Sequence, residues 1–230
     1  MNINIPYLIC SVLSFVPAIV LHEVAHGFAA YKLGDPTAKN QGRLTLNPIK
    51  HIDTFGTVIL PGMLMLLGGP VFGYAKPVPY DPRYFKDKRK GDLIVGLAGP
   101  AANFVMALFG AFLAWILYPT MPTLLQISPY FFYLDFFLAL FVLINLFLMF
   151  FNLLPIPPLD GSSIFAVLLP ERYLPKYYQI QRYALPIFFL IVFGLPYLFG
   201  MFGIDFNLIQ EYLDVTAYNI ARMILPAGFV

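Results

Sequence analysis

The sequence predicts an all-α polytopic membrane protein with about five to six transmembrane helices and a re-entrant or extended segment after the first helix. Hydrophobic residues make up 60% of the 230 residues and charged residues only 11%, whereas soluble domains carry about 25% charged residues. Several stretches exceed the roughly 18 apolar residues typical of a membrane span. The 21 prolines and 17 glycines lie largely between or inside those stretches. This composition excludes an ordinary water-soluble enzyme, and a net charge of only +2 indicates no nucleic-acid partner.

The first element is a helix over the apolar stretch 5–33, which is too long for the core of a signal peptide and has no charged segment before it. Further membrane spans are expected at 93–118, 131–154 and 184–202. A weaker stretch at 206–225 contains several charged residues, so it predicts an interfacial or short terminal helix.

The chain shows no internal repeat and no low-complexity linker. Residues 1–230 are therefore expected to form a single membrane-embedded domain. Its core is expected at about 5–170, followed by C-terminal helices at about 184–225.

The second apolar stretch, 55–75, is interrupted by Pro61-Gly62 and Gly68-Gly69-Pro70, which disfavour a straight helix. The loops before and after it, 34–54 and 76–91, are both basic, and Lys and Arg in short loops gather on the cytoplasmic side. A re-entrant segment keeps both loops on that side, whereas a full crossing would separate them. We expect a re-entrant segment, with a full second span as the alternative.

This topology orients the other loops as well. The loop 119–130 has no charged residue and is expected outside, together with the N-terminus. The loop 155–183 contains Arg172, Lys176 and Arg182 and is expected in the cytoplasm.

The first helix contains the sequence His22-Glu23-Val24-Ala25-His26, a match to the H-E-x-x-H motif. Positions i and i+4 lie on one face of a helix, so both histidines can bind the same zinc ion. Glu23 stands beside them and is expected to act as the general base toward a water molecule that zinc activates. The alternative is that these are bundle-facing polar residues with structural hydrogen bonds, although ionisable groups at membrane depth are costly and are usually functional.

A catalytic zinc site usually has a third protein ligand, and the candidates are His51, Asp135 and Asp160. His51 lies in a polar loop and is expected at the surface or at headgroup level, and Asp135 is expected to be interfacial. Asp160 ends a proline-rich break after the fourth apolar stretch, amid apolar neighbours, so it is the preferred ligand. Its alternative role is the N-cap of a helix that begins near Gly161, and both roles can coexist. The single cysteine excludes a cysteine-based metal cage.

The chain resembles the site-2 protease family of intramembrane zinc metalloproteases. The resemblance rests on the H-E-x-x-H motif, on Ala98-Gly99-Pro100-Ala101-Ala102-Asn103, and on the run from Asn152 to Gly161 with its Leu-Asp-Gly. Gly34-Asp35-Pro36-Thr37-Ala38 and Gly42-Arg43-Leu44-Thr45-Leu46-Asn47-Pro48 resemble a compact bacterial and archaeal subgroup without inserted PDZ or CBS domains. The similarity covers nearly all of residues 15–170.

The resemblance implies a zinc-dependent metalloendopeptidase with one Zn²⁺ per chain, bound by His22, His26 and Asp160, and with Glu23 as the catalytic base. It also implies that Asn152 steadies the substrate backbone or the oxyanion, and that Asn103 either packs helices or faces the site. The implied substrates are transmembrane segments of other membrane proteins, cleaved in the lipid bilayer by regulated intramembrane proteolysis. The implied location is the prokaryotic inner membrane.

Other functions are also compatible with the same residues. A metal or ion transporter could use the same His and Asp cluster, but it would not need Glu23 and usually has two corresponding halves. A catalytically silent scaffold would have lost one of the four catalytic positions, and all four are present. In a zincin that acts at the soluble face of the membrane, the motif usually lies on a cytosolic helix extension. Iron or cobalt could also bind such a ligand set.

An intramembrane protease must unwind its substrate helix and bring water to the metal. The segment 69–80 is rich in Gly and Pro and is expected to pair with an unwound substrate by strand addition, with a simple loop as the alternative. Because the basic loops are expected in the cytoplasm, the polar cleft that admits water is expected to open there.

Overall fold

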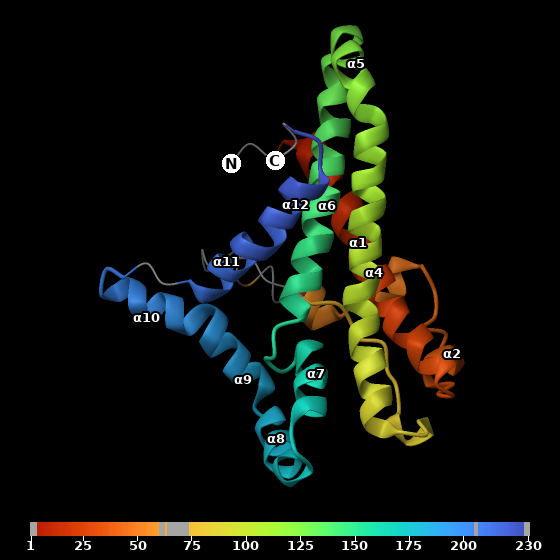
Figure 1. The fold of residues 1–230 in the computed structure, drawn as a ribbon, viewed down its shortest axis with the longest axis vertical. Helices are drawn as coiled ribbons and strands as arrows, with labels where there is room; N and C mark the ends of the chain where they lie inside the picture. The colour runs from red at the N-terminus through yellow and green to blue at the C-terminus, as the bar shows by residue number, and fades with distance from the viewer. Residues whose placement is uncertain (1–3, 60–62, 64–73, 205–206, 228–230) are drawn as a thin grey trace.

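Three long helices form the centre of the molecule: α1 (Ile5–Lys32), α4 (Lys88–Leu117) and α6 (Phe132–Asn152). Each of the three packs against the other two (Figure 1). The computed structural model describes residues 4–59, 63, 74–204 and 207–227. Within these ranges the regular secondary structure is entirely helical.

Shorter helices connect and flank the three central ones. Before α4 they are α2 (Thr37–Asn40), η1 (Pro48–His51), η2 (Thr54–Ile59) and η3 (Pro82–Tyr84). Between α4 and α6 they are η4 (Tyr118–Thr120), α5 (Met121–Ile127) and η5 (Pro129–Phe131). After α6 they are α7 (Gly161–Leu168), η6 (Glu171–Tyr173), α8 (Leu174–Gln181), α9 (Ala184–Phe189), η7 (Leu190–Gly194), α10 (Leu195–Met201), α11 (Leu208–Leu213), η8 (Asp214–Tyr218) and α12 (Asn219–Ile224).

Four helical stretches of the described chain are long and apolar enough to cross a membrane: Ile5–Lys32, Lys88–Ile127, Pro129–Asn152 and Ala184–Met201. They coincide with the predicted spans, and the predicted class of all-α polytopic membrane protein is confirmed. The second of them is longer than the predicted span at both ends. It begins early because the side chain of Asp87 accepts a hydrogen bond from the N–H of Lys90 and caps the first turn. It ends late because α4 continues through η4 into α5.

Most of the buried residues of α1 form one row, spaced four apart along its length. Because a helix repeats every 3.6 residues, such a row forms a single stripe, and it faces α4 and α6. The row contains Cys10, Ser14, Ala18, His22, His26 and Ala30. Both histidines of the motif therefore point into the bundle.

The contact between α4 and α6 is built on small residues from α4. Ala107, Ala111 and Ala114 pack against Leu138, Val142 and Leu146, and small side chains let two membrane helices approach closely. The C-terminal stretch joins the same cluster through Ala217, Ala221 and Leu225. Of the two expectations for 206–225, an interfacial or a short terminal helix, the second half fits the short terminal helix, because its small residues pack on α4 and α6.

The two ends of the predicted re-entrant segment lie side by side. The N–H of Tyr74 donates to the carbonyl of Gly56 at 3.0 Å, and the hydroxyl of Thr57 donates to the carbonyl of Tyr74 at 2.8 Å. A segment that crossed the membrane fully would place these residues on opposite faces. The flanking loops thus meet on one side, as predicted, while the course of 60–62 and 64–73 lies outside the described residues.

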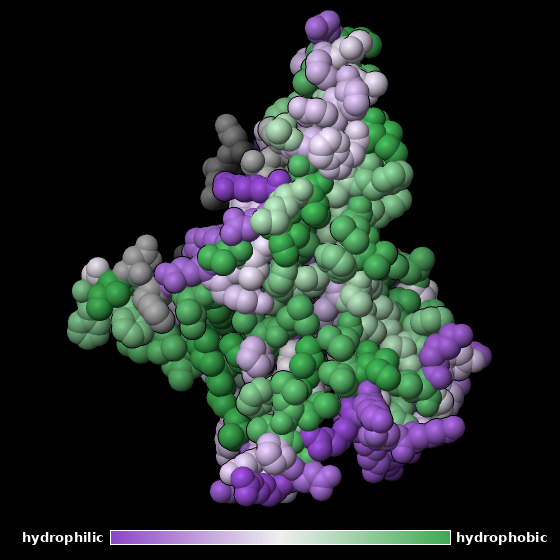
Figure 2. Space-filling view, viewed as in Figure 1, coloured by the Kyte–Doolittle hydropathy of each residue, from purple (hydrophilic) through white to green (hydrophobic). Residues whose placement is uncertain are grey.

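A large part of the hydrophilic surface lies at one end of the molecule, around the beginning of α4 and around α8, where Figure 2 shows it in purple below a broad apolar region. Smaller purple areas lie beside α11 and α12 and at the opposite tip. The basic residues of the loops 76–91 and 155–183 lie at this end, and α5 lies at the opposite end (Figure 1). The relative placement of the basic loops and of the uncharged loop 119–130 therefore agrees with the predicted topology.

Candidate metal centre

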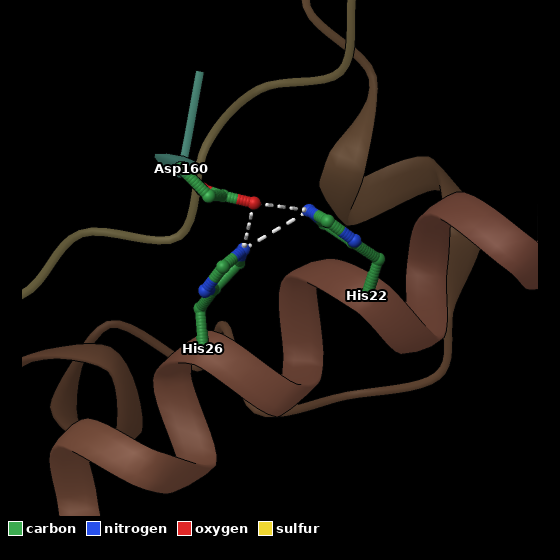
Figure 3. A group of neighbouring side chains, drawn as sticks. All are labelled: His22, His26 and Asp160. Carbon is green, nitrogen blue, oxygen red and sulfur yellow. Dashed lines mark hydrogen bonds and ion pairs between the residues drawn. The ribbon is translucent and has the colours of Figure 1, made fainter. Parts of the chain in front are cut away.

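His22, His26 and Asp160 bring three ligand atoms together inside the bundle (Figure 3). Nε2 of His22 lies 3.0 Å from Nε2 of His26, and Oδ2 of Asp160 lies 3.1 Å and 3.3 Å from these two nitrogens. Both histidines are buried and Asp160 is partly buried. Among the described residues, no other group of three or more His, Cys, Asp or Glu side chains has this geometry.

The outer nitrogens of the two imidazoles are hydrogen-bonded to groups that fix the rings. Nδ1 of His26 lies 2.6 Å from the carbonyl oxygen of Val95, which can only accept, so this nitrogen carries the proton. Nδ1 of His22 lies 2.6 Å from Oδ1 of Asn103, which also accepts. In a neutral imidazole with Nδ1 protonated, Nε2 has a free lone pair. Both lone pairs therefore face Asp160.

This arrangement fits a metal ion. Three electron-pair donors face one another within 3.3 Å, and Oδ2 of Asp160 is buried without a hydrogen-bond partner among the described residues. A metal cation placed between them would accept a lone pair from each of the three atoms and would satisfy the buried carboxylate oxygen. Two imidazole nitrogens and one carboxylate oxygen are a ligand set that suits zinc and leaves the fourth position open.

Asp160 reaches the cluster because the chain breaks after α6 and starts again as α7. Asp160 occupies the N-cap position of α7, but its side chain accepts no capping hydrogen bond, so its carboxylate is free to face the histidines. Gly161, the first residue of α7, has no positive φ. A Cβ there would collide with the backbone of Leu153 and Leu154, so glycine is required by close packing.

The other end of α7 is held by α4. Nη2 of Arg89 donates to the carbonyl oxygens of Val167 and Leu169, at 2.6 Å and 2.7 Å. The hydroxyl of Tyr177 donates to the carbonyl of Ser162 at 2.8 Å. These hydrogen bonds hold α7, the helix that begins directly after Asp160, in its position.

Gly99 brings α4 close to the histidine pair. A Cβ at this position would lie 2.6 Å from Nε2 of His22 and would also collide with the ring of His26. One turn later, Asn103 is fully buried and contacts His22. The Gly-Pro-x-x-Asn motif thus makes room for the imidazoles and orients one of them. Asn103 also donates to the carbonyl of Ala18 on α1 and to Oδ1 of Asn145 on α6, so its contacts are compatible with both expected roles, helix packing and facing the site.

Glu23 is tied to the extended segment 74–81. Its Oε2 accepts a hydrogen bond from the N–H of Val78 at 2.8 Å. Gly27, one turn after Glu23, makes this contact possible, because a Cβ there would lie 2.7 Å from Cγ1 of Val78. The carboxylate that follows His22 in the motif is therefore held by a backbone donor.

Two buried charged side chains anchor the same segment. Nη2 of Arg43 donates to the carbonyl oxygens of Lys76 and Pro77, at 2.7 Å and 3.3 Å. Asp35 accepts a hydrogen bond from the N–H of Asp81 at 2.6 Å. Both anchors come from the loop after α1 and flank Val78 along the chain.

The other candidate ligands lie outside the cluster. His51 was expected at the surface or at headgroup level, and the surface position is wrong: it is only 3% exposed, because η1 folds back on α1, and its Nε2 is bonded to the carbonyl of Thr45. Asp135 lies in the first turn of α6. Asn152 is the last residue of α6, and its amide donates to the carbonyl of Leu148 in its own helix. The substrate-binding role of Asn152 stays a prediction.

Asn145 and Arg43 were not among the site residues predicted from the sequence. Asn145 is fully buried, and its Oδ1 accepts a hydrogen bond from Asn103 at 3.0 Å. It is the single polar residue between Phe136 and Phe151, and a polar group at membrane depth is a signal of function that could have identified it.

Comparisons with known proteins place the chain in a family. The model of peptidase family M50 matches residues 124–195, which contain all of α6 and Asp160. A protein of Bacillus subtilis (strain 168) named "Putative zinc metalloprotease YwhC" is 43% identical over 192 residues, 83% of this chain and 81% of that protein. A protein of Mycobacterium tuberculosis (strain ATCC 25618 / H37Rv) named "Putative zinc metalloprotease Rip2" is 28% identical over 213 residues, 93% of this chain and 75% of that protein.

No solved structure matches the chain. The similarity to the Bacillus protein extends over most of both sequences, and the family match covers the region of the third candidate ligand. The chain belongs to peptidase family M50, the site-2 protease family that its motifs predicted.

Proposed function

We propose that this protein is an intramembrane zinc metalloendopeptidase that hydrolyses peptide bonds within or near transmembrane segments of other membrane proteins. The observation that carries the proposal is the convergence of His22, His26 and Asp160 within 3.3 Å inside an apolar helix bundle. Membership of a peptidase family and the zinc named in its relatives support the same activity. In this proposal the three residues bind one zinc ion per chain.

Zinc bound at this site would supply Lewis acidity toward water and toward the scissile carbonyl. Glu23 accepts the proton that a water molecule loses as its oxygen adds to the carbonyl carbon of the peptide bond. The same carboxylic acid then donates this proton to the leaving nitrogen as the C–N bond breaks. The N–H of Val78 holds one oxygen of Glu23 in place and leaves the other for the proton.

Strand addition of the substrate to the segment 74–79 is restricted, because this segment already makes hydrogen bonds within the protein. The N–H groups of Tyr74, Lys76 and Val78 are already used, and positions 77 and 79 are prolines. Between 74 and 79, Ala75 alone keeps an N–H that is not spent in this way. A substrate that pairs here would therefore bind mainly through its own N–H groups, which donate to carbonyl oxygens of the segment. The carbonyl oxygens of Tyr74, Lys76 and Pro77 already accept hydrogen bonds from Thr57 and Arg43, so a substrate would use their second lone pair.

We further propose that the protein lies in the inner membrane of a prokaryotic cell and that its active site opens to the cytoplasm. The basic residues at one end of the bundle support this orientation, because Lys and Arg in short loops gather on the cytoplasmic side.

Proteolysis is tested with the purified chain in liposomes that contain a membrane-spanning model substrate. The expected result is cleavage that stops when zinc is removed with a chelator and returns when zinc is added. A zinc-sensitive dye inside the same liposomes tests the transporter alternative. Zinc entry without cleavage would contradict the proposal, and cleavage without zinc entry would exclude the transporter.

A further inference from the structure

We infer that Asn145 is a positioning residue for the metal ligand His22, and that it acts through Asn103. Asn145 lies on α6, Asn103 on α4 and His22 on α1, so the interaction connects all three central helices. The inference rests on the proposed metal site. It assigns a role to a residue that contacts neither the metal ligands nor Glu23 in any hydrogen bond of the described structure.

The connection consists of consecutive hydrogen bonds. Nδ2 of Asn145 donates to the carbonyl oxygen of Phe141 at 2.8 Å. Oδ1 of Asn145 accepts from Nδ2 of Asn103 at 3.0 Å, and Nδ2 of Asn103 also donates to the carbonyl oxygen of Ala18 at 3.1 Å. Oδ1 of Asn103 lies 2.6 Å from Nδ1 of His22. The series thus runs from the backbone of α6 to the imidazole.

The bond to the carbonyl of Phe141 decides which group donates and which accepts in each of the other hydrogen bonds. A backbone carbonyl can only accept, so the amide nitrogen of Asn145 faces Phe141 and its oxygen faces Asn103. This oxygen requires a donor, so Asn103 turns its NH₂ group toward Asn145 and its own oxygen toward His22. The proton of the imidazole must then reside on Nδ1. The lone pair on Nε2 is left for the metal.

Burial makes this orientation costly to change. Asn103 and Asn145 are both fully buried, where an unpaired amide group costs roughly 1–3 kcal/mol. Rotation of either amide by 180° would place two donors or two acceptors in contact. The amide pair therefore holds one tautomer and one ring orientation of His22, the kind of outer contact that tunes metal sites.

His26 offers an internal comparison. Its Nδ1 donates directly to the carbonyl of Val95, so its tautomer depends on no side chain. Loss of Asn145 should therefore disturb His22 and leave His26 unchanged. A residue that merely packed the helices together would not distinguish between the two imidazoles.

Two variants of Asn145 separate hydrogen bonding from packing. Asn145→Leu keeps the approximate volume of the side chain and removes the oxygen that accepts a hydrogen bond from Asn103. Asn145→Asp, protonated in this apolar site, offers the same donor and acceptor pair as the amide. Val142→Ala is the matched control, because it removes packing from a fully buried position of the same helix, one turn away.

The measurements are the zinc dissociation constant, by competition with a chelator, and ¹⁵N NMR of the zinc-free protein labelled at histidine. The chain has 3 histidines, so the imidazole signals can be assigned with single His variants. In Asn145→Leu we expect zinc binding about 10-fold to 100-fold weaker and a mixture of tautomers at His22. Asn145→Asp and Val142→Ala should bind zinc as the wild type does.

Unchanged zinc affinity and a single His22 tautomer in Asn145→Leu would overturn the inference, as would an equal loss of affinity in Val142→Ala. If Asn145→Leu does not fold, the wild-type spectrum decides: a proton on Nε2 of His22 contradicts the inference, and a proton on Nδ1 agrees with it. Failure of the proposed function would be distinguishable from failure of this inference, because the wild-type protein itself would then bind no zinc.

Discussion

The carboxylate of Glu23 accepts a hydrogen bond from the backbone N–H of Val78 at 2.8 Å, across 55 positions of the sequence. This bond connects the proposed catalytic base to an extended segment that two other residues anchor. The geometry of the base therefore depends on the loop after α1 as well as on α1 itself. A substitution in that loop should affect catalysis without affecting the metal ligands.

Arg43→Gln is expected to lower the cleavage rate about tenfold, which corresponds to roughly 1.4 kcal/mol. The guanidinium of Arg43 donates to the carbonyl oxygens of Lys76 and Pro77, and its loss leaves the segment before Val78 weakly held. Zinc affinity should stay unchanged. Initial rates in liposomes and the zinc content of the same preparation measure the two effects.

Arg83→Gln is the matched control for this change. Arg83 follows the same segment, but its side chain is 84% exposed, and exposed ion pairs contribute little to stability. Its hydrogen bonds to Asp81 lower the pKa of that carboxyl group. Normal cleavage by Arg83→Gln and slow cleavage by Arg43→Gln are expected, and equal rates would contradict the anchoring role of Arg43.

Gly99→Ala is expected to weaken zinc binding at least about tenfold, because the added methyl group would occupy the space of the two imidazoles. Gly200→Ala is the control, since a Cβ there meets no atom within 4 Å. Zinc titrations of both variants test this prediction. Wild-type affinity in Gly99→Ala would show that α4 does not confine the histidines.

Asp160→Asn should weaken zinc binding by more than the roughly 10-fold to 100-fold typical of changes outside the ligand set. The amide keeps the shape of the side chain and removes the charge that faces the imidazole nitrogens. The zinc dissociation constant of the purified variant measures the effect. An affinity within twofold of the wild type would remove Asp160 from the proposed ligand set.

The proposed orientation is tested by labelling of single cysteines in intact cells. Cys10, the one native cysteine, is first replaced by alanine. Lys88 is the first residue of α4 and belongs to the basic loop 76–91, so Lys88→Cys should resist an impermeant reagent. Gln126 belongs to α5, which lies at the opposite end of the bundle (Figure 1), so Gln126→Cys should react. The reverse pattern would place the basic loops outside the cell.

The local parts of this fold and site could be predicted because they depend on spacing along one helix. Apolar length defines the spans, and the separation of four residues places His22 and His26 together. Asp160 could be proposed because prolines break the chain directly before it and its flanks are apolar. These signals all lie within short segments of sequence.

The remaining contacts could not be predicted, since they join residues far apart in the chain. Asn103 and Asn145 are separated by 42 positions, and Arg43 meets Lys76 across 33. His51 looked like a loop residue because its neighbours are polar, and its burial arises only when η1 folds onto α1. Such contacts depend on how the helices pack against one another, and this packing cannot be derived from a single sequence.

Cleavage of a membrane-spanning substrate by Glu23→Gln shows whether Glu23 is the base of a zinc protease. The variant keeps the side-chain shape and the three proposed ligands but removes the group that accepts a proton. We expect one zinc ion per chain, as in the wild type, and a cleavage rate at least about 100-fold lower. Cleavage at the wild-type rate by a zinc-loaded Glu23→Gln preparation would contradict this role of Glu23.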